Sequence, residues 1–210
     1  MPAGLQWLTV PVAVGGRRGQ LIDQVEILDR QFWRKHLRSV ELNYRRAPFF
    51  EEYFDEFSAT LECSAGLRLV DLNVRLIKWF MTLLGIGTPL LFASQLGLGG
   101  KRTELLANIC SYVGASTYLS PIGSAVYLLE ELETLESRSI EVLFHNYEHP
   151  RYQQLFPPFV PYASVIDLLF NEGPRAMEVV RMGRGSPFSA SQLLSFRPEA
   201  AGTQTLTFVP

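Results

Sequence analysis

The sequence is poor in cysteine and histidine, the side chains that most often form disulfides or bind transition metals. It contains two cysteines and three histidines among 210 residues. Cys63 and Cys110 stand far apart, and neither belongs to a Cys-x-x-Cys pair. We therefore expect neither a disulfide framework nor a zinc site. The spacing of His36, His145 and His149 gives no support to a metal site either.

Signals of nucleic-acid binding, nucleotide binding and export are also missing. The formal net charge is −2, so the chain lacks the basic excess that general nucleic-acid binding requires. The sequence contains neither of the common glycine-rich phosphate loops, and it has no G-x-S-x-G elbow. It does not begin with a cationic and apolar leader. We predict a cytoplasmic protein that uses no cofactor.

Charged residues are absent between Trp79 and Gly100, a run long enough to cross a bilayer. Gly85, Gly87 and Pro89 interrupt this run. Such interruptions are typical of a helix end followed by a short buried strand. We therefore predict a strand over residues 90–93 and no membrane association.

Patterns typical of helices and of strands alternate along the rest of the chain. Apolar residues at helical spacing predict helices over residues 29–44, 67–84, 102–113, 124–135 and 164–171, and a further helix that begins at Pro48 and includes Phe57. Apolar and β-branched runs predict strands over residues 7–14, 90–93, 116–120 and 140–144. This order favours an α/β fold, a mostly parallel sheet flanked by helices. We expect one domain over residues 1–182 and a flexible tail over 183–210, where Gly, Ser, Pro and Ala dominate.

A dense block of polar side chains follows the last predicted strand. Between Phe144 and Gly173 the chain carries two of its three histidines, three tyrosines, two glutamines and an aspartate among apolar residues. Polar groups beside a core segment must satisfy one another or bind a ligand, because burying them unpaired is costly. This block is the predicted site.

Two residues of this block are the main candidates for chemistry. His149 precedes Pro150, which favours an extended backbone in the loop after a strand. Its imidazole suits a general base or an anion ligand, and the alternative is a hydrogen bond to a carbonyl that stabilises the loop. Asp167 suits orientation of His149 or of a substrate amine. Alternatively, Ser164 caps the helix and Asp167 completes that cap.

Outside this block, four further residues are candidates for a functional or a structural role. Ser120 ends a predicted strand before a turn and a helix, an arrangement that could bind a phosphate or carboxylate on backbone N–H groups. Lys101 begins a helix and could contact a phosphate, although ordinary solvation is its alternative role. Cys110 lies on an apolar helix face and fits a buried structural thiol better than its alternative, a nucleophile. His36 could belong to a second polar patch or pack at a helix margin.

The ordered set of motifs resembles the WbqC-like protein family, found in bacterial polysaccharide and other biosynthetic gene clusters. The resemblance covers about residues 5–180. Its motifs are Trp7-Leu-Thr-Val-Pro11, Trp33-Arg-Lys-His36, Tyr44-Arg-Arg-Ala-Pro48, Lys101-Arg-Thr-Glu104, Tyr118-Leu-Ser120, Tyr147, His149-Pro150, Tyr152-Gln-Gln154 and Ser164-Val-Ile-Asp167 through Gly173. Family members carry an upstream segment before the first of these motifs. The resemblance therefore implies that the family's N-terminal strand or strands are missing here, and the sheet edge this leaves would allow homo-oligomers.

The resemblance also implies a function: a biosynthetic tailoring transferase, proposed to attach an aminoacyl group such as glycine to a sugar or other small acceptor, as in O-antigen biosynthesis. His149 and Asp167 would then be catalytic. The residues expected to bind the sugar or amino-acid derivative are Tyr147, Tyr152, Gln154, Ser120, Lys101, Tyr118 and His36.

Two other functions remain open. The chain could be a non-catalytic binding or scaffold protein, or an inactive truncated homologue, in which the polar block satisfies only itself. A nucleotide-dependent ligase is the third possibility, but the sequence lacks a phosphate loop for it.

Overall fold

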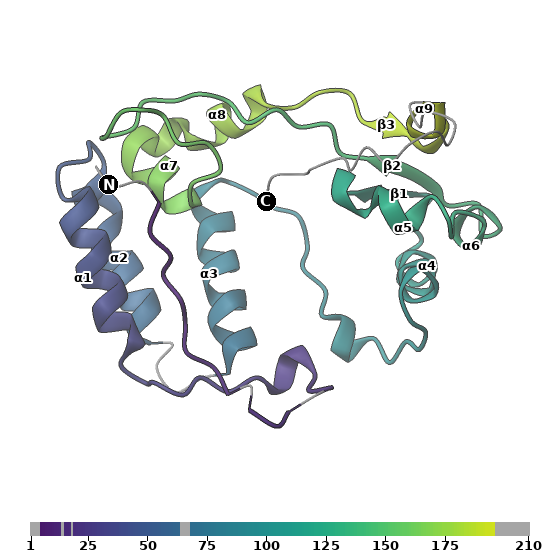
Figure 1. Cartoon of the computed structure of the whole chain (residues 1–210), viewed down its shortest axis with the longest axis horizontal. Coiled ribbons are helices and arrows are strands. Elements are labelled where there is room, and N and C mark those ends of the chain that lie inside the picture. The colour runs from purple at the N-terminus through teal and green to yellow at the C-terminus, as the bar shows by residue number, and fades with distance from the viewer. Residues whose placement is uncertain (1–4, 14, 18, 64–67, 196–210) are drawn as a thin grey trace, which may run out of the picture. The chain divides into compact units, whose positions relative to one another are not determined.

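The computed structural model describes residues 5–13, 15–17, 19–63 and 68–195. The chain folds as two compact units, each built from two separate stretches of sequence. The first unit comprises Met1–Thr88 and His149–Gly183, and the second comprises Pro89–Glu148 and Arg184–Pro210. Figure 1 labels the helices and strands of both units.

The first unit is helical in the part of it that the structure describes. Its elements are η1 Ile22–Gln24, α1 Phe32–Tyr44, α2 Phe50–Glu62, α3 Leu69–Leu83, α7 Val165–Glu172, η4 Gly173–Arg175 and α8 Ala176–Met182. Helix α2 packs against α1, α3 and α7. These contacts make α2 the centre of the unit.

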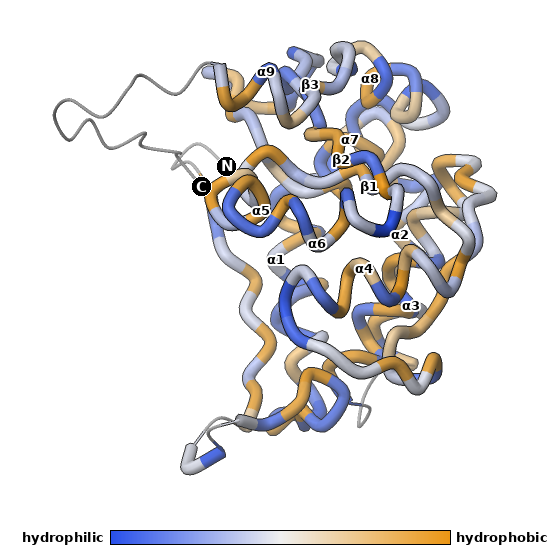
Figure 2. Tube along the Cα trace, turned by 90° about the vertical axis from the view of Figure 1, so that its right-hand side faces the viewer, coloured by the Kyte–Doolittle hydropathy of each residue, from blue (hydrophilic) through white to orange (hydrophobic). Residues whose placement is uncertain are grey.

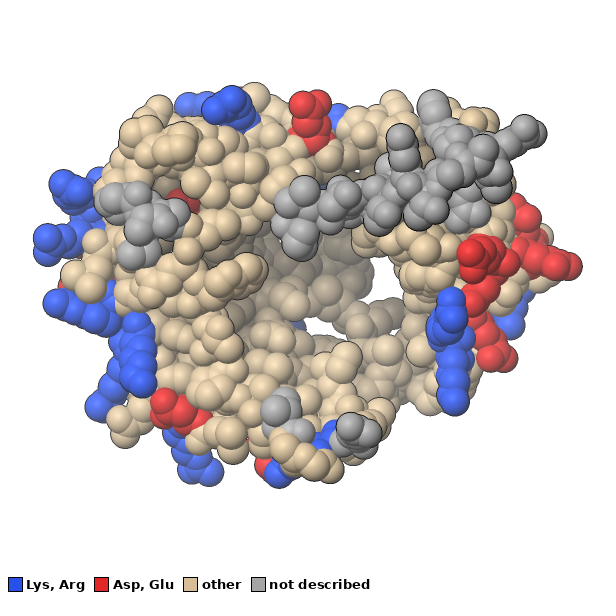
Figure 3. Space-filling view, viewed as in Figure 1, with Lys and Arg blue, Asp and Glu red and all other residues tan. Residues whose placement is uncertain are grey.

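Apolar residues at helical spacing explain why these helices form and pack. Figure 2 shows hydrophobic and hydrophilic positions alternating along the helices. The buried side chains include several aromatic rings, and Phe170 of α7 contacts Phe50 of α2 and Tyr44 of α1 at ring distances of 5.3 and 5.4 Å. The exposed face of α1 is basic instead, and Lys and Arg side chains gather over it in Figure 3.

The second unit contains the sheet. Strands β1 (Thr117–Ser120) and β2 (Glu141–Phe144) pair in parallel, from Thr117 opposite Glu141 to Ser120 opposite Phe144. Strand β3 (Phe188–Ser189) pairs antiparallel with β2. The remaining elements are η2 Ala93–Gln95, α4 Thr103–Tyr112, η3 Ile122–Ser124, α5 Ala125–Leu128, α6 Glu133–Glu136 and α9 Ala190–Ser195. A small mixed sheet flanked by helices fits the predicted α/β class.

Several predicted elements differ from the observed ones. Residues 7–13 are extended but pair only at Val12, opposite Ile27, so the first predicted strand does not form a ladder. Residues 90–92 are irregular and precede η2, so no strand forms there either. The predicted helix over residues 124–135 is divided into η3, α5 and α6. A strand needs a ladder of paired residues as well as apolar side chains. Residues 7–13 meet residues 26–28 only around Val12, and residues 90–92 pair with no strand among the described residues.

The C-terminal segment also differs from the expected tail, because β3 and α9 are ordered through Ser195 and β3 pairs with β2. The rest of the predicted tail, residues 196–210, lies outside the described residues.

Helix α3 ends at Leu83, and Gly85 follows with a positive φ of 64°. The uncharged run that begins at Trp79 is thus only partly helical. Among the described residues, no helix is long and apolar enough to cross a membrane.

Gly173 ends α7 with a φ of 53°, and a Cβ built on it would lie 2.4 Å from the Phe49 ring. We expect Gly173→Ala to lower the free energy of unfolding by about 2–5 kcal/mol, since backbone strain and overpacking add. Urea denaturation measures the change. Gly85→Ala is the control, because Gly85 has a φ of 64° and a Cβ added there would meet nothing within 4 Å. This control should cost about 1–2 kcal/mol, from strain alone. Equal losses in the two variants would contradict the steric explanation.

Candidate functional site

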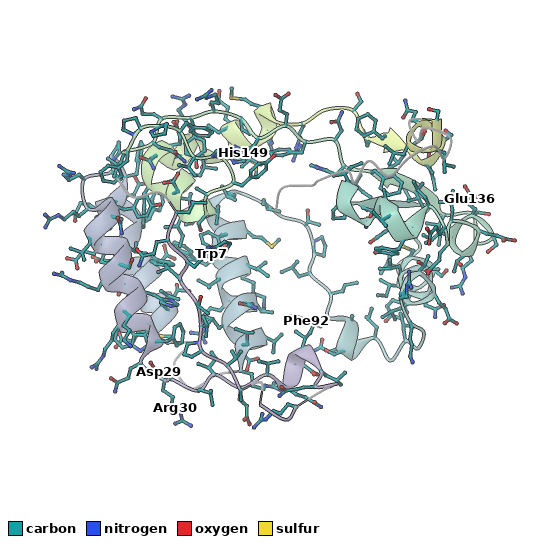
Figure 4. All side chains as sticks on the ribbon, viewed as in Figure 1. Trp7, Asp29, Arg30, Phe92, Glu136 and His149 are labelled. Atoms are coloured by element: carbon teal, nitrogen blue, oxygen red, sulfur yellow. The ribbon has the colours of Figure 1, made fainter. Side chains whose placement is uncertain are left out.

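A cavity of about 560 Å³ opens within the first unit. Its wall is contributed by the extended segment around Trp7, by α1, α2 and α3, and by residues 154–167. Figure 4 labels Trp7 on this segment, and the Trp7 side chain is 89% exposed. Most of the lining is apolar, including Phe32, Phe57, Leu72 and Phe80. Such a cavity has the size and composition of a small-molecule site.

Asp167 is the centre of the polar part of the cavity wall. Its side chain is only 7% exposed, yet its carboxylate accepts hydrogen bonds from several donors. The Tyr44 hydroxyl donates to Oδ1 at 2.9 Å, and the Tyr152 hydroxyl donates to Oδ2 at 2.6 Å. Gln154 Nε2 also donates to Oδ2 at 2.9 Å, and Asn171 Nδ2 lies 3.4 Å from Oδ1. The carboxylate is therefore held by neutral donors from several parts of the fold.

Tyr44 and Tyr152 both have raised pKa values, so their hydroxyls remain protonated hydrogen-bond donors. Burial raises the pKa of Tyr44 and the neighbouring Asp167 charge raises it further. Burial also raises the pKa of Tyr152, together with its hydrogen bond to Asp167. Because both hydroxyls hold their protons well above neutral pH, the carboxylate keeps its two tyrosine hydrogen bonds over the physiological range.

The loop before α7 is fastened to that helix at three consecutive residues. Tyr152 and Gln154 bind Asp167, while the backbone N–H of Gln153 donates to Glu172 Oε1 at 3.2 Å. Gln154 also exchanges hydrogen bonds with the backbone of Val160, at 3.0 and 2.8 Å. This bonding fixes the loop that forms one wall of the cavity.

The structure corrects one interpretation of the helix cap. Ser164 caps α7 as expected, because its Oγ accepts from the N–H of Ile166. Asp167 does not complete that cap, since its oxygens bind side chains of α1, the loop and Asn171 instead. Side chains from other parts of the fold thus bind the Asp167 carboxylate, which its place in the first turn of α7 would otherwise assign to the helix cap.

His36 of α1 lines the cavity, and its Nε2 lies 3.2 Å from the carbonyl oxygen of Thr9. A carbonyl can only accept, so Nε2 carries the hydrogen and Nδ1 carries the lone pair in the neutral ring. Burial lowers the pKa of His36 below its ordinary value, and the Thr9 carbonyl opposes this shift only in part. The ring is consequently neutral at pH 7 and retains a basic nitrogen.

His149 is placed differently from His36. It does not belong to the lining of the cavity. Its ring packs among Tyr162, Phe159 and Tyr152, with centroids 4.8, 5.9 and 6.2 Å away, and its Nδ1 is buried without a hydrogen-bond partner. The loop-stabilising bond to a carbonyl that the sequence suggested is thus not made by this nitrogen. His149 instead supports two tyrosines, one on the cavity wall and one bonded to Asp167.

The other predicted site residues belong to the second unit. Ser120 is buried, and its Oγ lies 2.5 Å from that of Ser124. Lys101 is exposed just before α4, and Tyr118 lies on β1. Tyr147 stacks on His145 at 5.6 Å. In the same unit, Cys110 is buried in the core, where burial raises the pKa of its thiol, as expected of a structural cysteine.

The residues that the structure describes contain no group of three or more His, Cys, Asp or Glu side chains that could hold a metal ion. Tyr44 was expected only as part of the motif Tyr44-Arg-Arg-Ala-Pro48 and of a second polar patch near His36, and not as a partner of Asp167. The one sequence signal for that bond is its hydroxyl, which needs a hydrogen-bond partner when buried.

Comparison with known proteins identifies the family. The family model of the WbqC-like protein family matches residues 1–179. The chain belongs to the WbqC-like protein family. It is also 37% identical over 183 residues to Rv1507c, an uncharacterised protein of Mycobacterium tuberculosis strain H37Rv. That alignment covers 86% of this chain and 78% of the relative. No solved structure matches this WbqC-like chain.

Removing one donor from the carboxylate should destabilise the first unit. We expect Tyr152→Phe to lower the free energy of unfolding by about 1.5–3 kcal/mol, the range for hydrogen bonds to charged groups. Tyr162→Phe is the control, because the Tyr162 side chain is 69% exposed. Urea denaturation of both variants compares the two losses. If Tyr162→Phe costs as much as Tyr152→Phe, the bond to Asp167 is not the stabilising interaction.

The lowered pKa of His36 should make stability depend on pH. Below about pH 6.5 the unfolded chain protonates this histidine while the folded chain resists, so acid favours unfolding. The stability advantage of wild type over His36→Gln should therefore shrink between pH 8 and pH 5.5. Urea denaturation at the two pH values measures it, and the pH 8 difference isolates packing and the Thr9 contact. A constant or growing advantage in acid would disprove the shift.

Proposed function

We propose that this WbqC-like chain is a tailoring transferase whose acceptor, a sugar or an amino-acid derivative, binds in the cavity of the first unit. The observation that carries the proposal is a cavity of about 560 Å³ with a buried carboxylate, a neutral histidine and several amide and hydroxyl groups on a mostly apolar wall. Small-molecule sites share this design, with a few convergent polar groups that orient the ligand.

The reaction we propose is acyl transfer from an activated acyl ester. The acceptor's amine or hydroxyl attacks the carbonyl carbon, a new C–N or C–O bond forms, and the bond to the leaving group breaks with its electron pair. The proton lost by the acceptor passes to Nδ1 of His36, which the Thr9 carbonyl leaves unprotonated. His36 replaces His149 as the proposed base, because only His36 lines the cavity. Asp167 orients the acceptor.

The other expected site residues, Lys101, Ser120, Tyr118 and Tyr147, belong to the second unit, and we assign them no step in this reaction. The Ser120 hydroxyl already forms a hydrogen bond with the Ser124 hydroxyl, so its first role is structural, at the end of β1.

One observation favours a second candidate, a non-catalytic binding protein. Both oxygens of Asp167 already accept hydrogen bonds from protein donors. A network that is complete without ligand can serve stability alone. If the chain is a transferase, a substitution confined to the cavity should alter the amount of product. If it is a non-catalytic binding protein, the same substitution should not.

Filling the cavity tests the proposal. Asn43 and Leu42 are neighbours on α1, but only Asn43 lines the cavity, whereas Leu42 is 55% exposed. In a host whose own gene is deleted, Leu42→Trp should restore the wild-type glycan and metabolite profile by mass spectrometry. Asn43→Trp should lower the restored product at least about tenfold, because a displaced acceptor reacts poorly. Equal restoration by two equally abundant variants would reject the cavity as the acceptor site.

A further inference from the structure

The residues that line the cavity carry charge of one sign only, and that sign is negative. Among the residues that line it, Asp167 is the single member of the Asp, Glu, Lys and Arg group. His36 is the one other ionisable side chain apart from tyrosines, and burial keeps it neutral at pH 7 by lowering its pKa. The lining therefore carries one negative charge and no positive charge at neutral pH.

The protein does not pair this carboxylate with a cation. Its four hydrogen-bond donors are two tyrosine hydroxyls and two carboxamides, all neutral. Their bonds and the adjacent start of α7 make the buried charge tolerable, but they leave its sign uncompensated. A cationic ligand in the cavity would compensate it, because the attraction of opposite charges is strong where water is excluded.

Four polar residues of the wall, Asn43, Ser39, His36 and Gln154, favour the same ligand, because the protein itself uses a donor of each. Asn43 Nδ2 donates to the Ser39 carbonyl at 2.7 Å, and the Ser39 hydroxyl donates to Gln6 Oε1 at 2.9 Å. His36 Nε2–H is directed at the Thr9 carbonyl, and Gln154 Nε2 at Val160 and Asp167. What these groups keep for a ligand is mainly acceptor capacity: Oδ1 of Asn43, Oγ of Ser39 and Nδ1 of His36.

We infer that the acceptor bound in this cavity carries a protonated amine on an apolar or ring-shaped body. An ammonium group has three donors and no acceptor, which matches a wall rich in acceptors around one carboxylate. A phosphate or carboxylate would instead be repelled by Asp167. This inference rests on the proposed function, and it narrows the acceptor from sugars and amino-acid derivatives in general to those that bear an amine. The ammonium group serves binding, so the acceptor is acylated on a hydroxyl, or on this amine after it has lost a proton.

Three probes of one shape test this selection on the full chain: 2-phenylethylamine, 2-phenylethanol and phenylacetate, which are cationic, neutral and anionic at pH 7. Calorimetric titration should give the amine an affinity at least about tenfold above the alcohol. Phenylacetate should bind more weakly than the alcohol. In Asp167→Asn the amine and the alcohol should bind within about twofold of each other, while Asp55→Asn, at an exposed position on α2, should keep the wild-type preference.

A second variant leaves the Asp167 network intact and keeps the test decisive if Asp167→Asn does not fold. Asn73 is an exposed residue of α3 that lines the cavity. Asn73→Lys should weaken the amine and strengthen phenylacetate, each about tenfold. Ile77→Lys adds the same charge to α3 at an exposed position outside the lining, and it should change neither probe.

The outcomes separate this inference from the function on which it rests. Equal affinity for the three probes, or no effect of Asn73→Lys, would overturn the charge selection while leaving a small-molecule site. Binding of none of the probes in the wild-type cavity would overturn the acceptor site as well. A preference for the amine that Asp167→Asn and Asn73→Lys both reduce would support the inference.

Discussion

The buried carboxylate of Asp167 is the interaction on which the first unit depends. A carboxylate that is 7% exposed costs several kcal/mol of folding free energy unless donors replace its water. One donor, Tyr44, lies 123 residues away in the sequence, and another, Tyr152, lies 15 residues away. The charge can thus be buried only after α1, the loop at Tyr152 and α7 have met. This requirement ties the two separate stretches of the unit together and completes one wall of the cavity.

The same hydrogen bonds that stabilise this unit also decide what the cavity can bind. Each donor that is turned toward Asp167 or toward a backbone carbonyl is lost to a ligand, whereas the acceptors opposite it remain. Stability and specificity are therefore set by one network. This coupling explains how a network can be complete without ligand and still be selective: completeness concerns hydrogen bonds, while the net charge that a ligand meets stays negative.

The helices could be predicted from the sequence because their signals are local. Spacing of apolar residues marked α1, α2 and α3, and glycines with positive φ stand near the predicted ends at Gly85, Gly114 and Gly173. Two predicted strands failed because a strand is completed by its neighbour, which local sequence does not specify. The site was predicted in part for the same reason. Asp167, Tyr152 and Gln154 lie close together in the sequence and were found together, while Tyr44 lies on another helix.

The two histidines show most clearly where sequence reasoning ends. His149 had the local signs of a catalytic residue, a loop after a strand and a following proline, whereas His36 was expected only to bind substrate or to pack at a helix margin. Burial and packing reverse their order. His149 is surrounded by aromatic rings with Nδ1 enclosed, while the Thr9 carbonyl fixes the tautomer of His36 and burial keeps that ring neutral by lowering its pKa. A base is defined by its accessible lone pair and its protonation state, and both are properties of the assembled fold.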